Sequence, residues 1–210
     1  MIKSAFAERA RLGREFYTRG DTLKVARELL GKRLVVASRK DKGRVSGIIV
    51  ETEAYMGPED KGSHAYNNRR TPRTEMMYAE GGRAYVYFIY GMYYQFNVVV
   101  NREGVPHAVL LRACEPYEGA QLMLERRAVR KETEISSGPG KLCIAFGIDR
   151  TYNGADLVEG ERVWIEDAGR RVTGREIASG PRIGINYAEE YIDKPWRFWI
   201  KENPHVSRKR

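Results

Sequence analysis

Three strand-like runs follow one another between residues 84 and 115 with no helical pattern between them, and this succession constrains the fold more than any other feature. The runs are AYVYFIY, YYQFNVVV and HAVLLRACE, all rich in aromatic and β-branched residues. The stretches between them, around YGM and NREGVP, read as turns. Short turns favour antiparallel neighbours, so this segment is predicted to form a three-stranded meander.

The rest of the chain adds strands and three helices. A β-hairpin is predicted from KRLVVASR and RVSGIIVETEAY, joined at KDKG, and strand character returns in RVWIED, PRIGIN and WRFWIK. Helices are predicted at DTLKVARELLG, where Asp21 can cap the start and Gly31 the end, at YEGAQLMLERRAVRK, and at SGPGKLCIAFG after Pro139. No βαβ alternation or linker is visible. We therefore expect one α+β domain, residues 1–210 with short basic tails, in which helices cover a curved, open-barrel-like antiparallel sheet and a β-hairpin protrudes.

The strand GIIVETEAY carries acidic residues at alternating positions. Because side chains alternate along a strand, Glu51, Glu53 and Tyr55 share one face, and Val50, Thr52 and Ala54 share the other. The pattern predicts two carboxylates and a phenol that project together. The plain alternative is a solvated strand face, which is the usual place for glutamate.

A single arginine, Arg112, interrupts the apolar run HAVLLRACEP. A buried guanidinium needs a carboxylate or several carbonyl groups, so Glu51 or Glu53 is its natural partner if the two strands are neighbours. A structural ion pair and a catalytic one remain equally open at this point.

Tyrosines crowd the segment YVYFIYGMYYQFN. A buried tyrosine must find a partner for its hydroxyl, so an ordinary core strand would use aliphatic residues. Tyr90 falls at the predicted tip, where an exposed ring suits insertion between bases. Tyr85, Phe88 and Phe96 are interpreted as core residues.

The charge balance favours an anionic partner. Lys and Arg number 37 against 28 for Asp and Glu, which gives a net charge of +9. Arg69, Arg70 and Arg73 lie in one loop-like stretch, and Lys141 follows a glycine-rich helix entry where a phosphate can bind. A solvated loop is the alternative for the arginines.

Other site classes are not indicated. The two cysteines, Cys114 and Cys143, suggest buried reduced thiols, and the three histidines are spaced too widely for a shared metal, so no metal site is expected. The charged start and the lack of a long apolar run predict an intracellular protein with no membrane association, in the cytoplasm or nucleoid, or in the nucleus of a eukaryote.

Taken together, several blocks resemble the alkyladenine DNA glycosylases, also called the 3-methyladenine DNA glycosylase or methylpurine glycosylase family. The blocks are VETEAYMGPEDKGSHA, RTPR, YVYFIYGMYYQFN, VLLRACEP, SGPGKLC and RIGI, and they follow in the family's order from the Asp21 helix to WRFWI. The resemblance implies a monomeric enzyme that needs no cofactor. Such an enzyme flips damaged purines out of double-stranded DNA and hydrolyses the N-glycosidic bond, leaving an abasic site without cutting the strand.

The resemblance also assigns roles to residues near the damaged base. Glu53 matches the general base that activates water, and Arg112 matches the arginine that helps to hold this water. Tyr55, His64 and Tyr87 match the aromatic walls around the flipped base, and Asn97 matches the residue that crowds the amine of normal guanine.

The remaining matched positions concern the DNA itself. Tyr90, with Met92 beside it, matches the residue inserted into the duplex. Four loop or turn residues match positions that contact the DNA backbone: Arg69, Thr71, Met77 and Lys141. Gly62 and the YYQF run fall where the match is loosest, so acceptance of hypoxanthine or ethenoadenine beside 3-methyladenine stays open. Two other functions also stay open: a lesion-binding protein without turnover, and an RNA-binding module on a similar open barrel.

Overall fold

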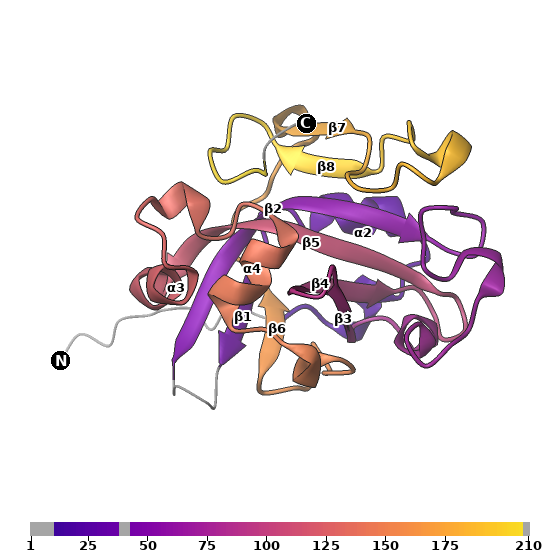
Figure 1. Ribbon diagram of the computed structural model, residues 1–210, viewed down its shortest axis with the longest axis horizontal. Coiled ribbons are helices and arrows are strands. Elements are labelled where there is room, and N and C mark those ends of the chain that lie inside the picture. Colours follow the sequence, from indigo (N-terminus) through magenta and orange to yellow (C-terminus); the bar gives the residue numbers. More distant parts are fainter. Residues whose placement is uncertain (1–10, 38–42, 208–210) are drawn as a thin grey trace.

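The computed structural model describes residues 11–37 and 43–207, which form four α-helices and eight strands. Figure 1 shows their arrangement. The helices are α1 (Arg14–Tyr17), α2 (Thr22–Glu28), α3 (Ala120–Arg127) and α4 (Pro139–Phe146). The strands are β1 (Arg33–Ala37), β2 (Arg44–Met56), β3 (Ala84–Ile89), β4 (Tyr93–Val100), β5 (His107–Glu118), β6 (Val163–Glu166), β7 (Ile177–Gly180) and β8 (Arg197–Ile200). Short 3-10 turns lie at Tyr66–Asn68, Glu75–Tyr78, Glu132–Glu134, Arg150–Tyr152, Gly174–Glu176 and Glu189–Tyr191.

All eight strands belong to one antiparallel sheet that does not close into a barrel. The order β3-β4-β5-β2-β1-β6 contains the predicted meander, and β8 joins β2 and β7 at the side (Figure 1). Strand β2 is long enough to share one edge between two partners, β1 along residues 44–48 and β8 along residues 51–53. The predicted α+β class with an antiparallel sheet is confirmed.

The pairing of β2 with β5 is irregular where the acidic residues lie. The register passes from Ile49 opposite Cys114 to Glu51 opposite Ala113, and then to Thr52 opposite Leu111. Each strand therefore has one unpaired residue here, Val50 on β2 and Arg112 on β5. Such bulges re-aim side chains and are common next to active sites.

Local signals place the helices correctly. Asp21 caps α2 by accepting a hydrogen bond from the Lys24 amide across 2.9 Å, and Gly31 takes a positive φ of 82° after the helix. Pro139 occupies the first turn of α4. The helix α3 is shorter than predicted, because Ala128 adopts the left-handed conformation and ends it.

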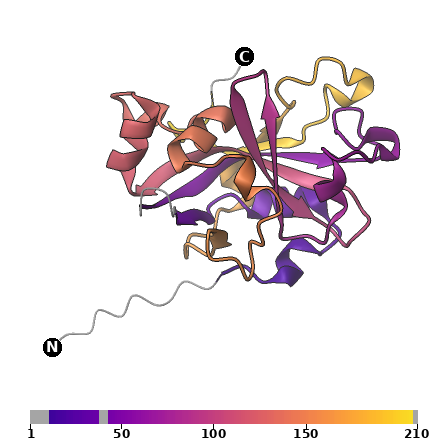
Figure 2. The same cartoon turned by 60° about the horizontal axis from the view of Figure 1, so that its bottom comes forward.

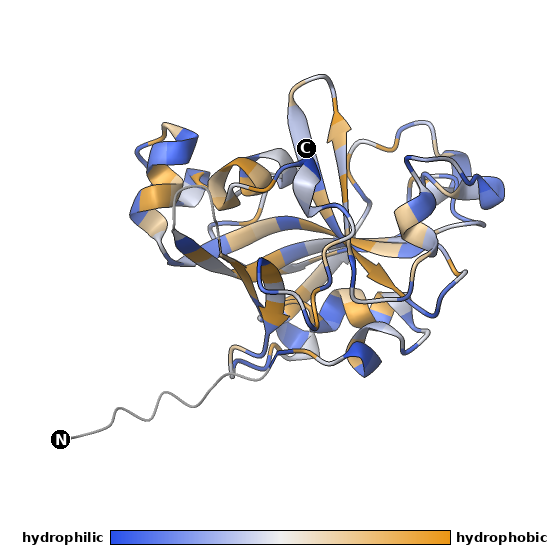
Figure 3. Cartoon of the chain, turned by 90° about the horizontal axis from the view of Figure 1, so that it is seen from below, coloured by the Kyte–Doolittle hydropathy of each residue, from blue (hydrophilic) through white to orange (hydrophobic). Residues whose placement is uncertain are grey.

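Helices α2 and α4 both pack on the central strands and share one core with them. Thr52 of β2 donates to the Ala26 carbonyl of α2 across 2.9 Å, and α4 packs on β4 and β5. Figure 3 shows apolar residues concentrated along the central strands and hydrophilic ones in the outer loops. Cys114 and Cys143 are free and buried in this core, and burial raises the pKa of both thiols, so the prediction of buried thiols is confirmed.

Three expectations are corrected or fall outside the described residues. The segment PRIGIN forms an irregular loop rather than a strand, with Gly184 at a φ of 83°, and β7 was not predicted. The KDKG turn lies mostly outside the described residues, although β1 and β2 pair as expected. The basic tails also lie largely outside them.

The hairpin β3–β4 stands out from the body of the molecule, as predicted (Figure 2). Its turn comprises the three residues 90–92, of which Tyr90 and Gly91 have positive φ. Phe96 is fully buried as expected, but Phe88 is 48% exposed and is not a core residue. Among the described residues, no helix combines the length and apolar character needed to cross a membrane.

Candidate active site

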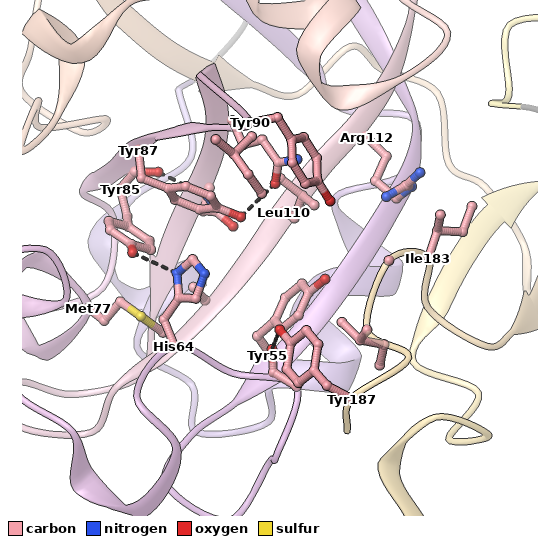
Figure 4. A pocket seen from close by; sticks show the side chains of 17 residues that line it. Tyr55, His64, Met77, Tyr85, Tyr87, Tyr90, Leu110, Arg112, Ile183 and Tyr187 are labelled. Atoms are coloured by element: carbon pink, nitrogen blue, oxygen red, sulfur yellow. Dashed lines mark hydrogen bonds between the residues drawn. The ribbon is translucent and has the colours of Figure 1, made fainter. Parts of the chain in front are cut away.

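A pocket opens between the hairpin, strands β2 and β5, and the loop that follows β7. It contains about 570 Å³ of empty space, part of it open to solvent. Figure 4 shows His64, Tyr85 and Tyr87 on one side, with Tyr55 and Tyr187 across from them. Three predicted pocket residues, Tyr55, His64 and Tyr87, thus line one cavity together.

The wall around His64 is aromatic, and Arg73 lies against its outer part, with Cζ 5.0 Å from the centre of the Tyr87 ring. Nδ1 of His64 hydrogen-bonds to the Tyr85 hydroxyl across 2.9 Å, and its ring lies 4.6 Å from that of Tyr87. Burial, aided by the positive charges of Arg73 and Arg69, lowers the pKa of His64 to about 4. The imidazole is therefore neutral at pH 7, so it does not repel a cationic ligand.

Behind the floor of the pocket lies the carboxylate of Glu53, which is fully buried. Oε1 accepts the Ile183 amide across 2.8 Å and lies 3.2 Å from Nη1 of Arg112, and Oε2 accepts the Tyr55 hydroxyl across 2.8 Å. The pocket is lined not by Glu53 itself but by these three neighbours. The solvated strand face, the plain alternative for this strand, is wrong.

The second glutamate, Glu51, forms the other half of the charged network. Its carboxylate accepts hydrogen bonds from Nε of Arg112 across 3.0 Å and from Nη1 of Arg197 across 3.1 Å. The amide and the hydroxyl of Ser207 each donate to it across 2.8 Å. Burial opposes the charge of Arg112, but the carboxylates of Glu53 and Glu51 together outweigh it and raise its pKa. The predicted pairing of Arg112 with a glutamate is confirmed with both candidates.

Asn97 lies on β4 at the inner side of the pocket and is buried. Its amide Nδ2 donates to the Tyr85 carbonyl across 3.1 Å, which fixes the orientation of the side chain. On the same strand Gln95 accepts the Tyr87 hydroxyl across 2.5 Å. Two polar side chains therefore face the cavity from the hairpin.

The residues predicted to contact DNA differ in their exposure to solvent. Tyr90 and Met92 at the hairpin tip are 72% and 62% exposed. Arg69 and Lys141 are also exposed, and Thr71 is half-buried. Met77 is 2% exposed and its side chain lines the pocket, so a contact with the DNA backbone would have to come from its main chain.

Several residues of the site were missed by sequence reasoning. Ile183 contributes a backbone amide, which has no side-chain signature, and Tyr187 lies in the loop that was read as a strand or left unassigned. The RIGI block pointed to this loop without indicating its role. Within the described parts of the chain, no group of three or more acidic, histidine or cysteine side chains could hold a metal ion.

Comparison with known proteins identifies the family of this chain. The methylpurine-DNA glycosylase (MPG) family model matches residues 15–204. A protein of Desulfitobacterium hafniense (strain Y51), named "Putative 3-methyladenine DNA glycosylase", is 48% identical over 205 residues, covering 94% of this chain and 98% of that protein. A protein of Clostridium acetobutylicum with the same name is 50% identical over 205 residues, covering 94% of this chain and 97% of the relative. The chain belongs to the methylpurine-DNA glycosylase family.

Proposed function

We propose that this protein is a DNA glycosylase that removes N-alkylated purines from double-stranded DNA by hydrolysing the bond between base and sugar. The observation that carries the proposal is the buried carboxylate of Glu53 behind the floor of an aromatic pocket. Family membership and the names of the relatives support the same reaction. A purine reaches such a pocket only after its nucleotide has rotated out of the duplex.

The walls suit a flat cationic base. The rings of His64 and Tyr87 face that of Tyr55 across the cavity, so a purine can stack between them (Figure 4). Purines alkylated at N3 or N7 carry a positive charge, which aromatic faces attract. Neutral His64 adds no opposing charge.

Glu53 is the proposed general base. A carboxylate has about four lone-pair sites. The Ile183 amide and the Tyr55 hydroxyl occupy two of them, and Nη1 of Arg112 lies 3.2 Å from Oε1. A free site can accept a proton from a water held near Arg112 at the pocket floor. The water oxygen then bonds to C1′, the electron pair of the C–N bond moves to the purine, and one proton of the water passes to Glu53.

The leaving group sets which bases are released easily. A cationic alkylpurine departs as a neutral molecule, whereas hypoxanthine needs a proton or a hydrogen bond as it leaves. None of the described residues that line the pocket is a lysine, which fits direct hydrolysis rather than a Schiff-base route with strand cleavage.

The hairpin tip supplies the part that enters the duplex. Tyr90 is mostly exposed beside Met92, and its ring can fill the gap left by the rotated nucleotide. Such insertion offsets unstacking that costs a few kcal/mol per step.

One experiment tests the reaction. Wild type, Glu53→Gln and Glu166→Gln are incubated with duplex DNA carrying one alkylated purine or hypoxanthine, and free base and alkali-labile abasic sites are measured. Glu166 is a suitable control because it is a buried carboxylate paired with Arg33 on β1, outside the pocket. We expect Glu53→Gln to lose on the order of 10²–10⁴ in rate and still to bind lesion DNA.

Each contrary outcome has a defined meaning. Equal activity in wild type and Glu53→Gln would exclude Glu53 as the base. A wild type that binds lesion DNA tightly and releases no base would favour a lesion-binding protein without turnover. Tight binding to single-stranded RNA, with none to lesion DNA, would favour the RNA-binding module.

A further inference from the structure

A buried arginine that does not line the pocket lies directly behind it. The guanidinium of Arg182 donates to both carboxylate oxygens of Asp60, across 2.5 Å and 2.7 Å, and to the Ala54 carbonyl across 3.0 Å. Its Cζ atom lies 4.7 Å from the centre of the Tyr55 ring and 5.0 Å from that of the Trp196 ring. Both charged side chains of the pair are fully buried.

Asp60 organises the loop that leads to His64. Oδ2 accepts the Met56 amide across 3.1 Å and Oδ1 accepts the Gly62 amide across 2.9 Å, so the carboxylate binds both sides of the turn. A Cβ atom added at Gly62 would lie 2.8 Å from Nη2 of Arg182, so the bare glycine makes room for the guanidinium. Two residues later, His64 forms one wall of the pocket.

Arg182 organises the two neutral donors of Glu53. The next residue, Ile183, gives its amide to Oε1, and Tyr55, on which the guanidinium stacks, gives its hydroxyl to Oε2. A shift of Arg182 therefore moves the Ile183 amide and releases one side of the Tyr55 ring. The aromatic wall and the carboxylate depend on the same contact.

We propose that Asp60 and Arg182 form a positioning pair that holds the His64 loop, the Tyr55 ring and the Glu53 carboxylate in one geometry for base excision. The inference rests on the proposed glycosylase function. It extends that function to two residues that touch neither the base nor the attacking water. A misplacement of about 1 Å at a reacting group can lower a rate on the order of 10²-fold.

Stability alone does not account for such a pair. Buried ion pairs are often no more stabilising than apolar residues of the same volume, because both charges lose their hydration. Their planar, bidentate geometry instead fixes the relative orientation of the two segments that they join. Here those segments are the two loops that carry His64 and Ile183.

The test compares Arg182→Lys, Asp60→Asn and the double variant with wild type. Lysine keeps the charge but loses the bidentate fork and the stacked plane, and asparagine keeps the shape but loses the charge. We expect single-turnover excision with enzyme in excess to slow 10- to 100-fold in each variant, as the geometric argument suggests. The double variant should lose no more than the worse single one, since the residues act as a unit. Affinity for duplex DNA containing a tetrahydrofuran abasic-site analogue should stay within about twofold, because that ligand places no base in the pocket.

Arg33→Lys provides the matched control. Arg33 and Glu166 form another buried pair, between β1 and β6, and neither residue lines the pocket. This variant should lose stability without slowing single-turnover excision by folded protein. If Arg182→Lys does not fold, Asp60→Asn carries the test.

Three results would overturn the inference. The first is an excision rate within twofold of wild type in folded Asp60→Asn. The second is an equal slowing in the Arg33→Lys control, and the third is a loss of abasic-analogue affinity that matches the loss of rate. A wild type that releases no base would instead remove the proposed function itself, and this inference with it.

Discussion

Arg112 donates through Nε to Oε1 of Glu51 across 3.0 Å, and both side chains are buried. Nη1 of the same guanidinium reaches Glu53 at 3.2 Å, so one arginine bridges two carboxylates from the same strand. Arg197 supplies the second positive charge at Glu51. The charges of the two buried carboxylates and the two guanidinium groups therefore balance. Glu51 holds in place the arginine that contacts Glu53, the proposed general base.

Glu51→Gln should therefore destabilise the protein. The amide cannot neutralise Arg112 and Arg197, and breaking a buried pair typically costs about 3–5 kcal/mol. Urea unfolding measures the loss. Glu118→Gln is the control, because Glu118 forms an exposed pair with Arg44 and should cost at most about 1 kcal/mol. Equal losses in the two variants would contradict the role of Glu51.

Tyr90→Ala should weaken binding to lesion DNA and leave the fold intact. The side chain is 72% exposed, so the free energy of unfolding should change by no more than about 0.5 kcal/mol. Loss of the inserted ring should lower affinity roughly tenfold or more, since about 1.4 kcal/mol corresponds to a factor of ten.

Fluorescence anisotropy with lesion duplexes and urea unfolding measure the two quantities for Tyr90. Tyr117→Ala is the control, because Tyr117 is also exposed but lies at the far end of β5. A large loss of stability in Tyr90→Ala would mean that the tip ring belongs to the core.

Much of the fold follows from local patterns in the sequence. The meander, the Asp21 cap, the Pro139 entry and the tip position of Tyr90 depend on residues close in the chain, and all four agree with the structure. Strand alternation also placed Glu53 and Tyr55 on one face, where the structure shows them hydrogen-bonded to each other.

The burial of Glu51 and Glu53 could not be predicted from local patterns in the sequence. Glu51 and Glu53 are covered by Ser207 and by the loop at Ile183, which lie more than a hundred residues away in the chain. No local pattern encodes such a contact. The prediction of a strand at PRIGIN was wrong for a related reason. Its isoleucines alternate as in a strand, but Gly184 turns the chain.

Asn97→Ser should raise the excision of normal guanine relative to alkyladenine. Asn97 is fixed by its bond to the Tyr85 carbonyl and occupies space in the pocket, so a smaller side chain admits the guanine amine. A change of this size in a pocket is worth about 1–3 kcal/mol of discrimination, or roughly tenfold and more. Base release from unmodified and from alkylated DNA gives the ratio. An unchanged ratio would show that Asn97 does not exclude guanine.

The last prediction concerns pH and His64. The ordinary pKa of histidine is 6.5, and burial with the nearby arginines lowers that of His64 to about 4 in the folded protein. Between these pH values the unfolded chain binds a proton at His64 and the folded protein does not, so the free energy of unfolding falls as the pH falls through this window. The contribution of His64 to the free energy of unfolding is fully present above pH 6.5 and is lost below about pH 4. Its upper bound is about 3–4 kcal/mol, and solvent screening at the half-buried ring makes the real effect smaller.

Urea unfolding between pH 4.5 and 8 checks this expectation for wild type, His64→Phe and Tyr87→Phe. His64→Phe removes the titrating group and should lose less stability than wild type as the pH falls. Tyr87→Phe alters the same wall without removing the imidazole, so its pH dependence should follow that of wild type. Parallel curves for wild type and His64→Phe would show that the imidazole is not held neutral by its surroundings. The wall would then become cationic near pH 6 and repel the alkylated base that it is proposed to stack on.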